Sequence, residues 1–126
     1  MTLVLDSGAL IALERHDRPM WRRMKAAYLG GRVPLSHGGV VGQAWRSRGP
    51  RQALLATALA AIDVRPVDEA LGRAAGELLA IAKRADVIDA ALVLLASDGD
   101  EILTSDPDDI ETLAALSQRH VELIRV

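Results

Sequence analysis

Short aliphatic segments alternate with helix-forming segments along the whole sequence, and this alternation is the feature that most constrains the fold. Each aliphatic segment has the length and the bulky side chains of a buried strand. Strands that alternate with helices are typical of α/β domains, in which a mainly parallel central sheet is flanked by helices. The predicted strands are Thr2–Asp6, Val33–Ser36, Ile62–Val67, Glu101–Thr104 and Val121–Arg125.

The segments between these strands carry the start and stop signals of helices. Ser7 and Asp68 are predicted to cap helices, and Pro19 suits a first turn. Gly30-Gly31 and Gly49-Pro50 are predicted to end or interrupt helices. No linker, internal repeat or low-complexity tract is present, so residues 1–126 are predicted to form a single domain. The predicted helices are Ser7–Glu14, Pro19–Leu29, Gly39–Arg48, Arg51–Ala61, Asp68–Lys83, Asp86–Ala96 and Pro107–Ser117.

The composition excludes several classes of site. Because there is no cysteine, the chain has no disulfide scaffold, thiolate metal site or cysteine nucleophile, which fits a cytoplasmic protein. The core must be mainly aliphatic, since phenylalanine is absent. No apolar run reaches the roughly 18–20 residues that a membrane-spanning helix needs, and the N-terminal segment lacks the basic lead-in of a signal peptide.

The charges are divided unequally between the two halves of the sequence. Residues 1–60 carry nine Lys and Arg against three acids, a balance of +6, and residues 61–126 carry six against fourteen, a balance of −8. This asymmetry indicates a side that binds polyanions and a side that binds cations. Solvated helix faces would give the same asymmetry, so charge alone leaves both interpretations open.

Acidic residues from distant parts of the sequence are predicted to meet at one edge of the sheet. Asp6 ends the first strand and Asp106 follows the fourth, and ligand sites of parallel sheets lie beyond the carboxyl ends of the strands. Asp86 and Asp89 are three residues apart, hence on one helix face, and Asp109 repeats this spacing from Asp106. Clustered carboxylates repel one another unless a cation is bound, and oxygen ligands select Mg²⁺ or Mn²⁺.

Each acid also has a purely structural interpretation. Asp86 is placed to cap its helix, and Asp106, Asp108 and Asp109 can serve as capping and dipole partners. Asp6 is harder to explain in this way, because an acid at the end of a buried strand is costly unless it is paired or bound to metal. The three histidines show no metal-ligand spacing and are predicted to be surface or loop residues: His16, His37 and His120.

Together the acidic segments resemble the PIN-domain family. The segments that carry the resemblance are LVLDSGALIALE, ADVIDAALVLLA and LTSDPDDI, in this order, and VVGQAWRSRGPRQALL resembles toxins of the VapC type. The resemblance implies a single PIN-like domain, an Mg²⁺- or Mn²⁺-dependent endoribonuclease, a cognate antitoxin and a homodimer. It implies that Asp6, Asp86 and Asp106 are the catalytic and metal-binding acids, with Asp89 and Asp109 in support.

One position departs from the family pattern. The resemblance implies a Glu in the helix after the second strand, where this sequence has Gln43. An amide oxygen can bind a metal or a metal-bound water but carries no charge. Thr104 and Ser105 are expected either to hydrogen-bond a carboxylate or a phosphate oxygen, or only to satisfy the turn after their strand.

The basic half of the sequence offers two clusters of residues for contacts with RNA phosphates. The first surrounds the Gly49-Pro50 break, and the second lies on one predicted helix. Few aromatic residues are present, which argues against a surface on which bases stack. The clusters are Arg46, Arg48 and Arg51, and Arg22, Arg23 and Lys25.

Two other functions are considered beside the ribonuclease. A non-catalytic domain of the same fold, binding RNA or protein, would explain the neutral Gln43. A phosphoacceptor receiver domain would need a second acid beside Asp6 and a lysine after a late strand, yet no lysine lies beyond Lys83. The acids therefore favour the ribonuclease.

Overall fold

Five parallel strands form one sheet in the computed structural model, which describes residues 1–84 and 86–126. The strand order is β3-β2-β1-β4-β5, and each neighbouring pair runs parallel. This confirms the predicted α/β fold, with a sheet that is wholly parallel among the described residues. The strands are β1 (Leu3–Leu5), β2 (Leu35–His37), β3 (Asp63–Arg65), β4 (Glu101–Thr104) and β5 (Glu122–Arg125).

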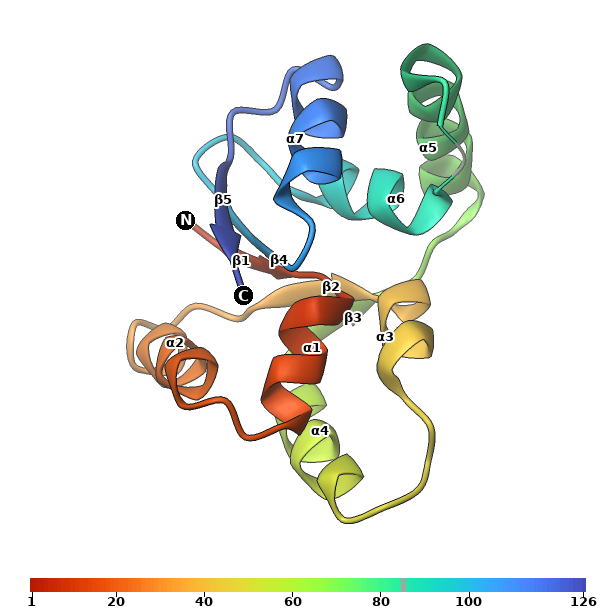
Figure 1. Cartoon of the computed structure of the whole chain (residues 1–126). Helices are drawn as coiled ribbons and strands as arrows, with labels where there is room; N and C mark the ends of the chain where they lie inside the picture. Colours follow the sequence, from red (N-terminus) through yellow and green to blue (C-terminus); the bar gives the residue numbers. More distant parts are fainter. Residues whose placement is uncertain (85) are drawn as a thin grey trace.

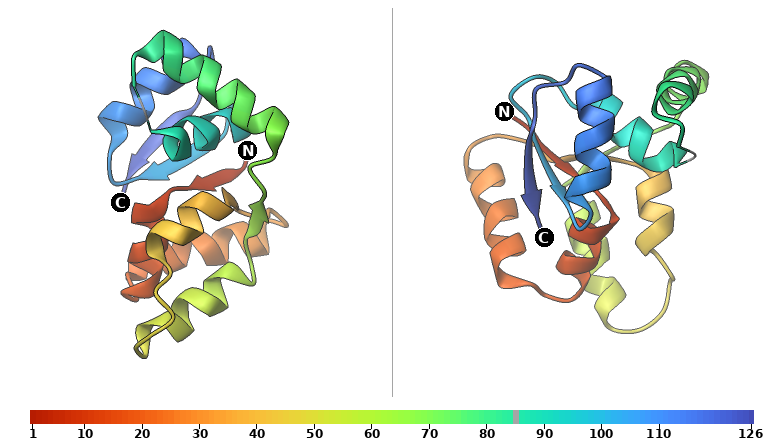
Figure 2. Two further views of the ribbon diagram at one scale, coloured as in Figure 1. Left: turned by 90° about the vertical axis from the view of Figure 1, so that its right-hand side faces the viewer. Right: turned by 45° about the horizontal axis from the view of Figure 1, so that its top comes forward.

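Helices cover both faces of this sheet (Figures 1 and 2). The helices of the first half, α1 to α4, lie on one face, and α5 to α7 lie on the other. Ala85, the first residue of the ADVIDAALVLLA motif, lies outside the described residues. The helices are α1 (Ser7–Glu14), α2 (Arg18–Leu29), α3 (Gly38–Ala44), α4 (Arg51–Leu59), α5 (Glu69–Ala82), α6 (Val87–Leu95) and α7 (Pro107–Leu116).

The order of the strands creates a switch point between β1 and β4. From β1 the chain moves outward through β2 to β3, and then crosses to β4 and β5 on the other side of β1. The connections therefore leave β1 and β4 toward opposite faces of the sheet. In open parallel sheets, the crevice that binds ligands is expected at the carboxyl ends of the two strands at such a switch point. Asp6 directly follows β1, and Ser105 and Asp106 directly follow β4.

Aspartates cap several of the helices that begin near this edge of the sheet. Asp68 and Asp86 accept backbone N–H groups at the starts of α5 and α6, as predicted. The prediction for α1 was wrong by one residue, because Asp6 is its cap and Ser7 is already helical. The helix predicted over Gly39–Arg48 ends at Ala44, since the chain turns to extended backbone at the next residue.

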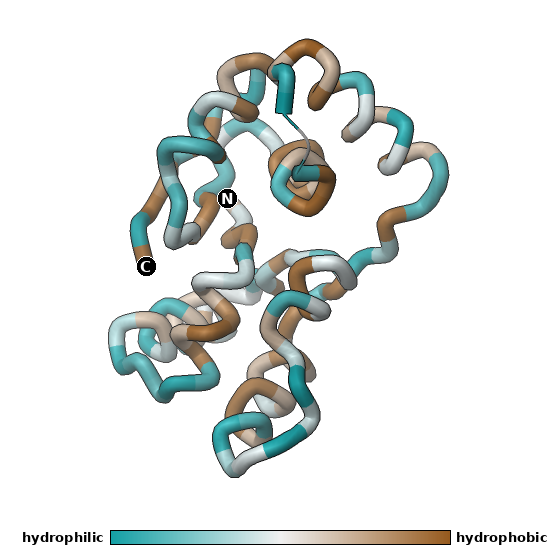
Figure 3. Tube along the Cα trace, turned by 45° about the vertical axis from the view of Figure 1, so that its right-hand side comes forward, coloured by the Kyte–Doolittle hydropathy of each residue, from teal (hydrophilic) through white to brown (hydrophobic). Residues whose placement is uncertain are grey.

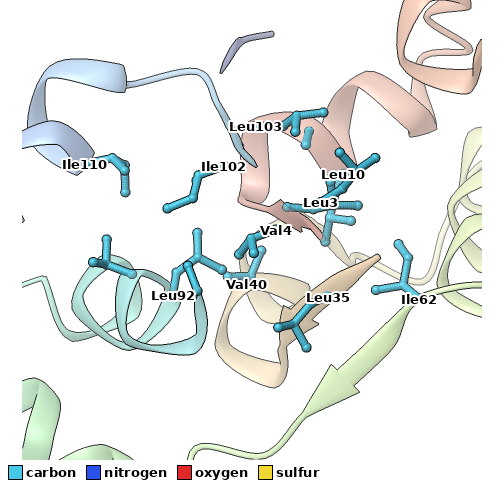
Figure 4. Close-up of a cluster of buried hydrophobic side chains, with 14 of the residues drawn as sticks. Leu3, Val4, Leu10, Leu35, Val40, Ile62, Leu92, Ile102, Leu103 and Ile110 are labelled. Atoms are coloured by element: carbon cyan, nitrogen blue, oxygen red, sulfur yellow. The ribbon is translucent and has the colours of Figure 1, made fainter. Parts of the chain in front are cut away.

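The core is aliphatic and encloses the strands between the two helical layers (Figure 4). Val4 and Ile102 of the central strands are fully buried, as is Leu92 of α6. Figure 3 shows α6 as a largely hydrophobic helix, in keeping with the buried run Ala90–Val93. No helix in the described residues is long and apolar enough to cross a membrane.

The prediction for the histidine at the end of β2 was wrong. His37 was predicted to be a surface or loop residue, but it is the last residue of β2 and is 0% exposed, because α6 covers this strand end. Gly39 allows close packing beside the ring, because an added Cβ there would stand 3.0 Å from Cε1 of His37.

Replacing Leu92 with Ala should lower the free energy of unfolding by about 2–5 kcal/mol, because a fully buried side chain would leave a cavity. Replacing Leu29, which is 72% exposed, should change it by less than about 0.5 kcal/mol. Urea denaturation of both variants measures the difference. Equal effects would contradict the placement of α6 in the core.

Candidate active site

Asp6 is held in place at the junction between β1 and β4. Its backbone N–H donates to the carbonyl of Leu103 at 3.1 Å, which extends the pairing of the two strands. Its side chain is buried, and its two oxygens accept the backbone N–H groups of Ala9 at 3.0 Å and Ser105 at 3.2 Å. These donors offset the cost of burying the carboxylate and tie Asp6 to both sides of the junction.

The turn after β4 lies directly against the start of α1. A Cβ on Gly8 would stand 2.5 Å from the Ser105 Oγ, so only glycine leaves room for this contact. Thr104 is fully buried, and its Oγ1 accepts the backbone N–H of Asp106 at 2.9 Å. Ser105 thus meets a carboxylate through its backbone rather than its hydroxyl, and Thr104 shapes the turn that carries Asp106.

The first turn of α6 brings two further acids to this edge of the sheet. Oδ1 of Asp86 accepts the backbone N–H groups of Ile88 at 3.0 Å and of Asp89 at 3.1 Å, so Asp86 is the helix cap. This confirms its structural role and leaves the predicted metal-binding role as a prediction. Because both of these bonds use Oδ1, the cap leaves Oδ2 of Asp86 available to another partner.

Asp89 is the acid on which the others converge. Burial, together with the charge and hydrogen bonding of Asp86, raises the pKa of its carboxyl from 3.8 to about 7. The negative charges of Asp6 and Asp106 act on this pKa in the same direction. The charges of acids from β1, the start of α6 and the turn after β4 thus all act on one half-buried carboxyl.

Asp106 and Asp109 form a second pair at the start of α7. Asp106 is the N-terminal flanking residue of α7, but its side chain makes no capping hydrogen bond. A hydrogen bond with Asp109, together with the charges of Asp109 and Asp108, raises the pKa of the Asp106 carboxyl. The structural interpretation of Asp106 as a side-chain cap is therefore wrong, and its carboxyl is exposed at the crevice.

Arg84 supplies positive charge beside these acids. Its Nη1 lies 2.8 Å from Oδ1 of Asp109, and the pair joins the end of α5 to the first turn of α7. Sequence reasoning missed this residue, because 25 positions separate the partners and no local spacing links them. Asp109 therefore pairs with the Arg84 guanidinium and also lies beside Asp106.

The side chains that meet at this edge of the sheet offer carboxylate oxygens as donors. Carboxylate oxygens without thiolates are the ligands that Mg²⁺ and Mn²⁺ prefer. Within the described part of the chain, no three acidic or histidine side chains are already arranged to enclose an ion. The acids supply the negative charge that a cation site needs. Their side chains would have to move closer together to bind an ion.

Gln43 lies on α3, near the end of the helix, and its side chain is exposed. Among the described residues it makes no hydrogen bond to any of the acids. Its predicted contribution to the site therefore rests on the sequence resemblance alone.

The basic cluster around Gly49 lies on an ordered loop. Oε1 of Gln52 accepts the backbone N–H groups of Arg46 and Ser47, each at 2.9 Å, although Ser47 and Gly49 have positive φ angles of 59° and 87°. Nη1 of Arg46 also donates to the carbonyls of Gly42 and Trp45. The structure thus commits part of Arg46 to the end of α3. All three arginines of this cluster are exposed: Arg46, Arg48 and Arg51.

The second basic cluster lies on α2, where Arg22, Arg23 and Lys25 are exposed. Two of these residues border a cavity of about 350 Å³ that also includes Arg18 and Trp21. Another cavity, of about 440 Å³, is lined by Gly8, Arg15 and Ser105 and therefore adjoins the supports of Asp6. Both basic clusters are exposed to solvent and accessible to RNA phosphates.

The fold, but not the sequence, is similar to that of a known protein. No protein-family model and no curated protein sequence matches this chain. The crystal structure of VapBC2 from Rickettsia felis, bound to a DNA fragment from their promoter, is similar with a TM-score of 0.71. The similarity covers 98% of this chain and 98% of that chain at 11% sequence identity. It supports the predicted single-sheet α/β fold over the whole chain.

The raised pKa of Asp89 predicts a pH dependence for protein freed of metal by a chelator. The folded state binds this proton more tightly than the unfolded chain, where the carboxyl has its ordinary pKa of 3.8. The resulting stabilisation is complete below that value and is lost as the pH rises toward about 7. The free energy of unfolding should therefore fall over this range, and Asp89→Asn should reduce the fall.

Chemical denaturation at several pH values measures this effect, with Asp63→Asn as a control at an exposed acid far along the sheet. The prediction fails if the Asp89 and Asp63 variants both follow the profile of the unmodified protein.

Proposed function

We propose that this chain is a metal-dependent endoribonuclease and that it acts as the toxin of a toxin–antitoxin pair. The observation that carries the proposal is the convergence of Asp6, Asp86 and Asp106 on the half-buried Asp89. These acids come from three separate elements and meet at the switch point of a parallel sheet, where ligand sites of such folds lie. Their chemistry fits a divalent cation.

The acids would hold Mg²⁺ or Mn²⁺, with Asp6, Asp86 and Asp106 as its ligands. When bound, the ion would supply an activated water and stabilise the charge that develops on the phosphorus of an RNA phosphodiester. Asp6 is oriented for this role by two backbone N–H groups. Asp89 adds a fourth carboxylate, and Asp109, which is paired with Arg84, holds Asp106 from the other side.

The basic loop between α3 and α4 would bind the phosphates of the RNA. Gln52 accepts the backbone N–H groups of Arg46 and Ser47 and so holds the start of the loop that carries the arginines. An ordered loop loses less entropy when a ligand binds. The contacts would be with phosphates and would therefore set the position of the strand rather than select its sequence.

The proposed partners follow from the resemblance and from the fold. The VapC-type resemblance implies a cognate antitoxin and a homodimer, and the similarity in fold to VapBC2 supports the first of these. We include both in the proposal. Co-expression with the product of a neighbouring reading frame, followed by co-purification, would test the antitoxin.

Adding Mn²⁺ to metal-free protein should raise the free energy of unfolding, by about 2.7 kcal/mol when the ion is at 100 times its Kd. Asp6→Asn should remove most of this effect and most RNA cleavage. Asn keeps an oxygen that can cap α1, so the variant should still fold. The melting temperature measured against Mn²⁺ concentration, together with cleavage of a labelled RNA, checks both.

The control is Asp63→Asn, the same chemical change at an exposed acid that pairs with Arg65. A protein that binds RNA but cleaves none at saturating Mg²⁺ or Mn²⁺ would support the non-catalytic alternative. A melting temperature that does not respond to either ion would contradict the metal site.

Replacing Arg46, Arg48 and Arg51 with Ala should weaken RNA binding and flatten its salt dependence. For a single strand, the slope of log K against log salt should fall by about 0.7 for every phosphate that the variant no longer binds. The matched control replaces Arg22, Arg23 and Lys25, which removes the same charge from α2. Equal slopes for the two triple variants would show that the loop has no special role.

A further inference from the structure

His37 makes two hydrogen bonds that fix the state of its ring. Its Nδ1 accepts the backbone N–H of Gly39 at 3.1 Å, which caps α3. Its Nε2 lies 2.9 Å from the carbonyl oxygen of Ile88 in α6. A carbonyl only accepts and an amide only donates, so the proton must be on Nε2. The ring is 0% exposed and therefore has no access to water as an alternative partner.

The surroundings of this ring leave it little freedom to move. A Cβ on Gly39 would stand 3.0 Å from Cε1 of His37 and 3.3 Å from Cγ1 of Ile88. Glycine at this position thus makes room for the ring and for the Ile88 side chain together. The contact connects the end of β2, the start of α3 and the first turn of α6.

The hydrogen bond from His37 to Ile88 reaches the helical turn that carries two of the site's acids. Ile88 lies between Asp86 and Asp89, and its own N–H is bonded to the Asp86 side chain. On the sheet, Val4 is paired with Leu35, so counting two residues along both strands places His37 beside Asp6. His37 therefore links the strand end next to Asp6 with the helical turn that carries the other two acids.

No other hydrogen bond among the described residues joins the first turn of α6 to a strand. The remaining bonds of this turn are internal to α6: the Asp86 side chain accepts the N–H groups of Ile88 and Asp89, and its carbonyl accepts that of Ala90. Apolar packing buries the next turn of α6, but the hydrophobic effect is non-directional and does not by itself set which way the polar groups of the first turn face. A small rotation of α6 would move Asp89 relative to Asp6.

We propose that His37 is a positioning residue, which holds the first turn of α6 so that Asp86 and Asp89 face Asp6 across the crevice. The consequence for cation binding rests on the proposed function, whereas the consequence for the geometry of α6 does not. His37 touches neither substrate nor metal in this role and acts only through the Ile88 carbonyl.

Two substitutions separate the two hydrogen bonds. In His37→Asn, the side-chain oxygen takes the place of Nδ1 and can still accept the Gly39 N–H, but nothing reaches Ile88. In His37→Gln, the side-chain nitrogen takes the place of Nε2 and can still donate to Ile88, but the cap of α3 is removed. Each variant lacks one hydrogen bond and part of the ring. If His37 only stabilised the fold, the two variants should therefore show similar amide exchange in α6 and similar Mn²⁺ affinity.

The first measurement is amide hydrogen exchange at Ile88 and Asp89 in metal-free protein. Exchange should be faster in His37→Asn than in His37→Gln, after correction for the global stability of each variant. The second measurement is Mn²⁺ affinity by calorimetry, which should fall about 10-fold or more in His37→Asn and be largely retained in His37→Gln. RNA cleavage should follow the affinity.

Equal exchange rates in the two variants would overturn the positioning role. Faster exchange in His37→Asn with unchanged Mn²⁺ affinity would overturn its link to the site. If the unmodified protein binds no Mn²⁺ and cleaves no RNA, the proposed function fails, and the exchange rates alone decide whether His37 positions α6.

Gly39→Ala provides a second route if neither histidine variant folds. The added methyl group would press on the His37 ring and on Ile88 while leaving both residues in place. Exchange at Ile88 and Asp89 should rise, whereas Gly42→Ala, an added methyl group in open space on the same helix, should leave it unchanged. Identical exchange in the two alanine variants would also overturn the proposal.

Discussion

The parallel pairing of β1 with β4 brings the candidate site together. Leu5 pairs with Leu103, and the Asp6 N–H continues the pairing by one further bond, so the two chains leave the sheet side by side. Gly8 then allows the turn after β4 to lie against α1, and the Ser105 N–H reaches Asp6. Because α6 packs over the neighbouring end of β2, Asp86 and Asp89 lie at the same edge of the sheet as acids that are distant in sequence. Changing this register by one residue would separate them all.

The fold compensates most of these acids but not all of them. Asp6 and Asp86 accept backbone N–H groups at helix N-termini, where the partial positive charge of the helix favours an anion. Asp109 is paired with Arg84. Asp89 is different, because burial together with the charge and hydrogen bonding of Asp86 raises the pKa of its carboxyl to about 7. Asp106 makes no capping hydrogen bond either, and a hydrogen bond with Asp109 raises its pKa. A bound cation would offset the charge of both acids.

The local part of this arrangement could be predicted from the sequence, and the long-range part could not. Strand ends and helix caps depend on neighbouring residues, so β4 and the cap at Asp86 were predicted correctly. His37 was misplaced because the predicted strand stopped at Ser36, and a single histidine carries no sign that a helix fifty residues away will cover it. The Arg84–Asp109 pair depends likewise on how α5 and α7 pack. Only tertiary structure determines such contacts.

The basic and acidic halves of the sequence lie on opposite faces of the sheet. Helices α1 to α4 come from the basic half and cover one face of the sheet, whereas α5 to α7 come from the acidic half and cover the other. Both halves reach the crevice at the strand ends. Without a cation the acids there would repel a phosphate, and within the Debye length of about 8 Å salt screens this repulsion only in part. On the proposed function, a divalent ion must therefore bind before or together with RNA, because it offsets the negative charge of the acids at the point where the two halves meet.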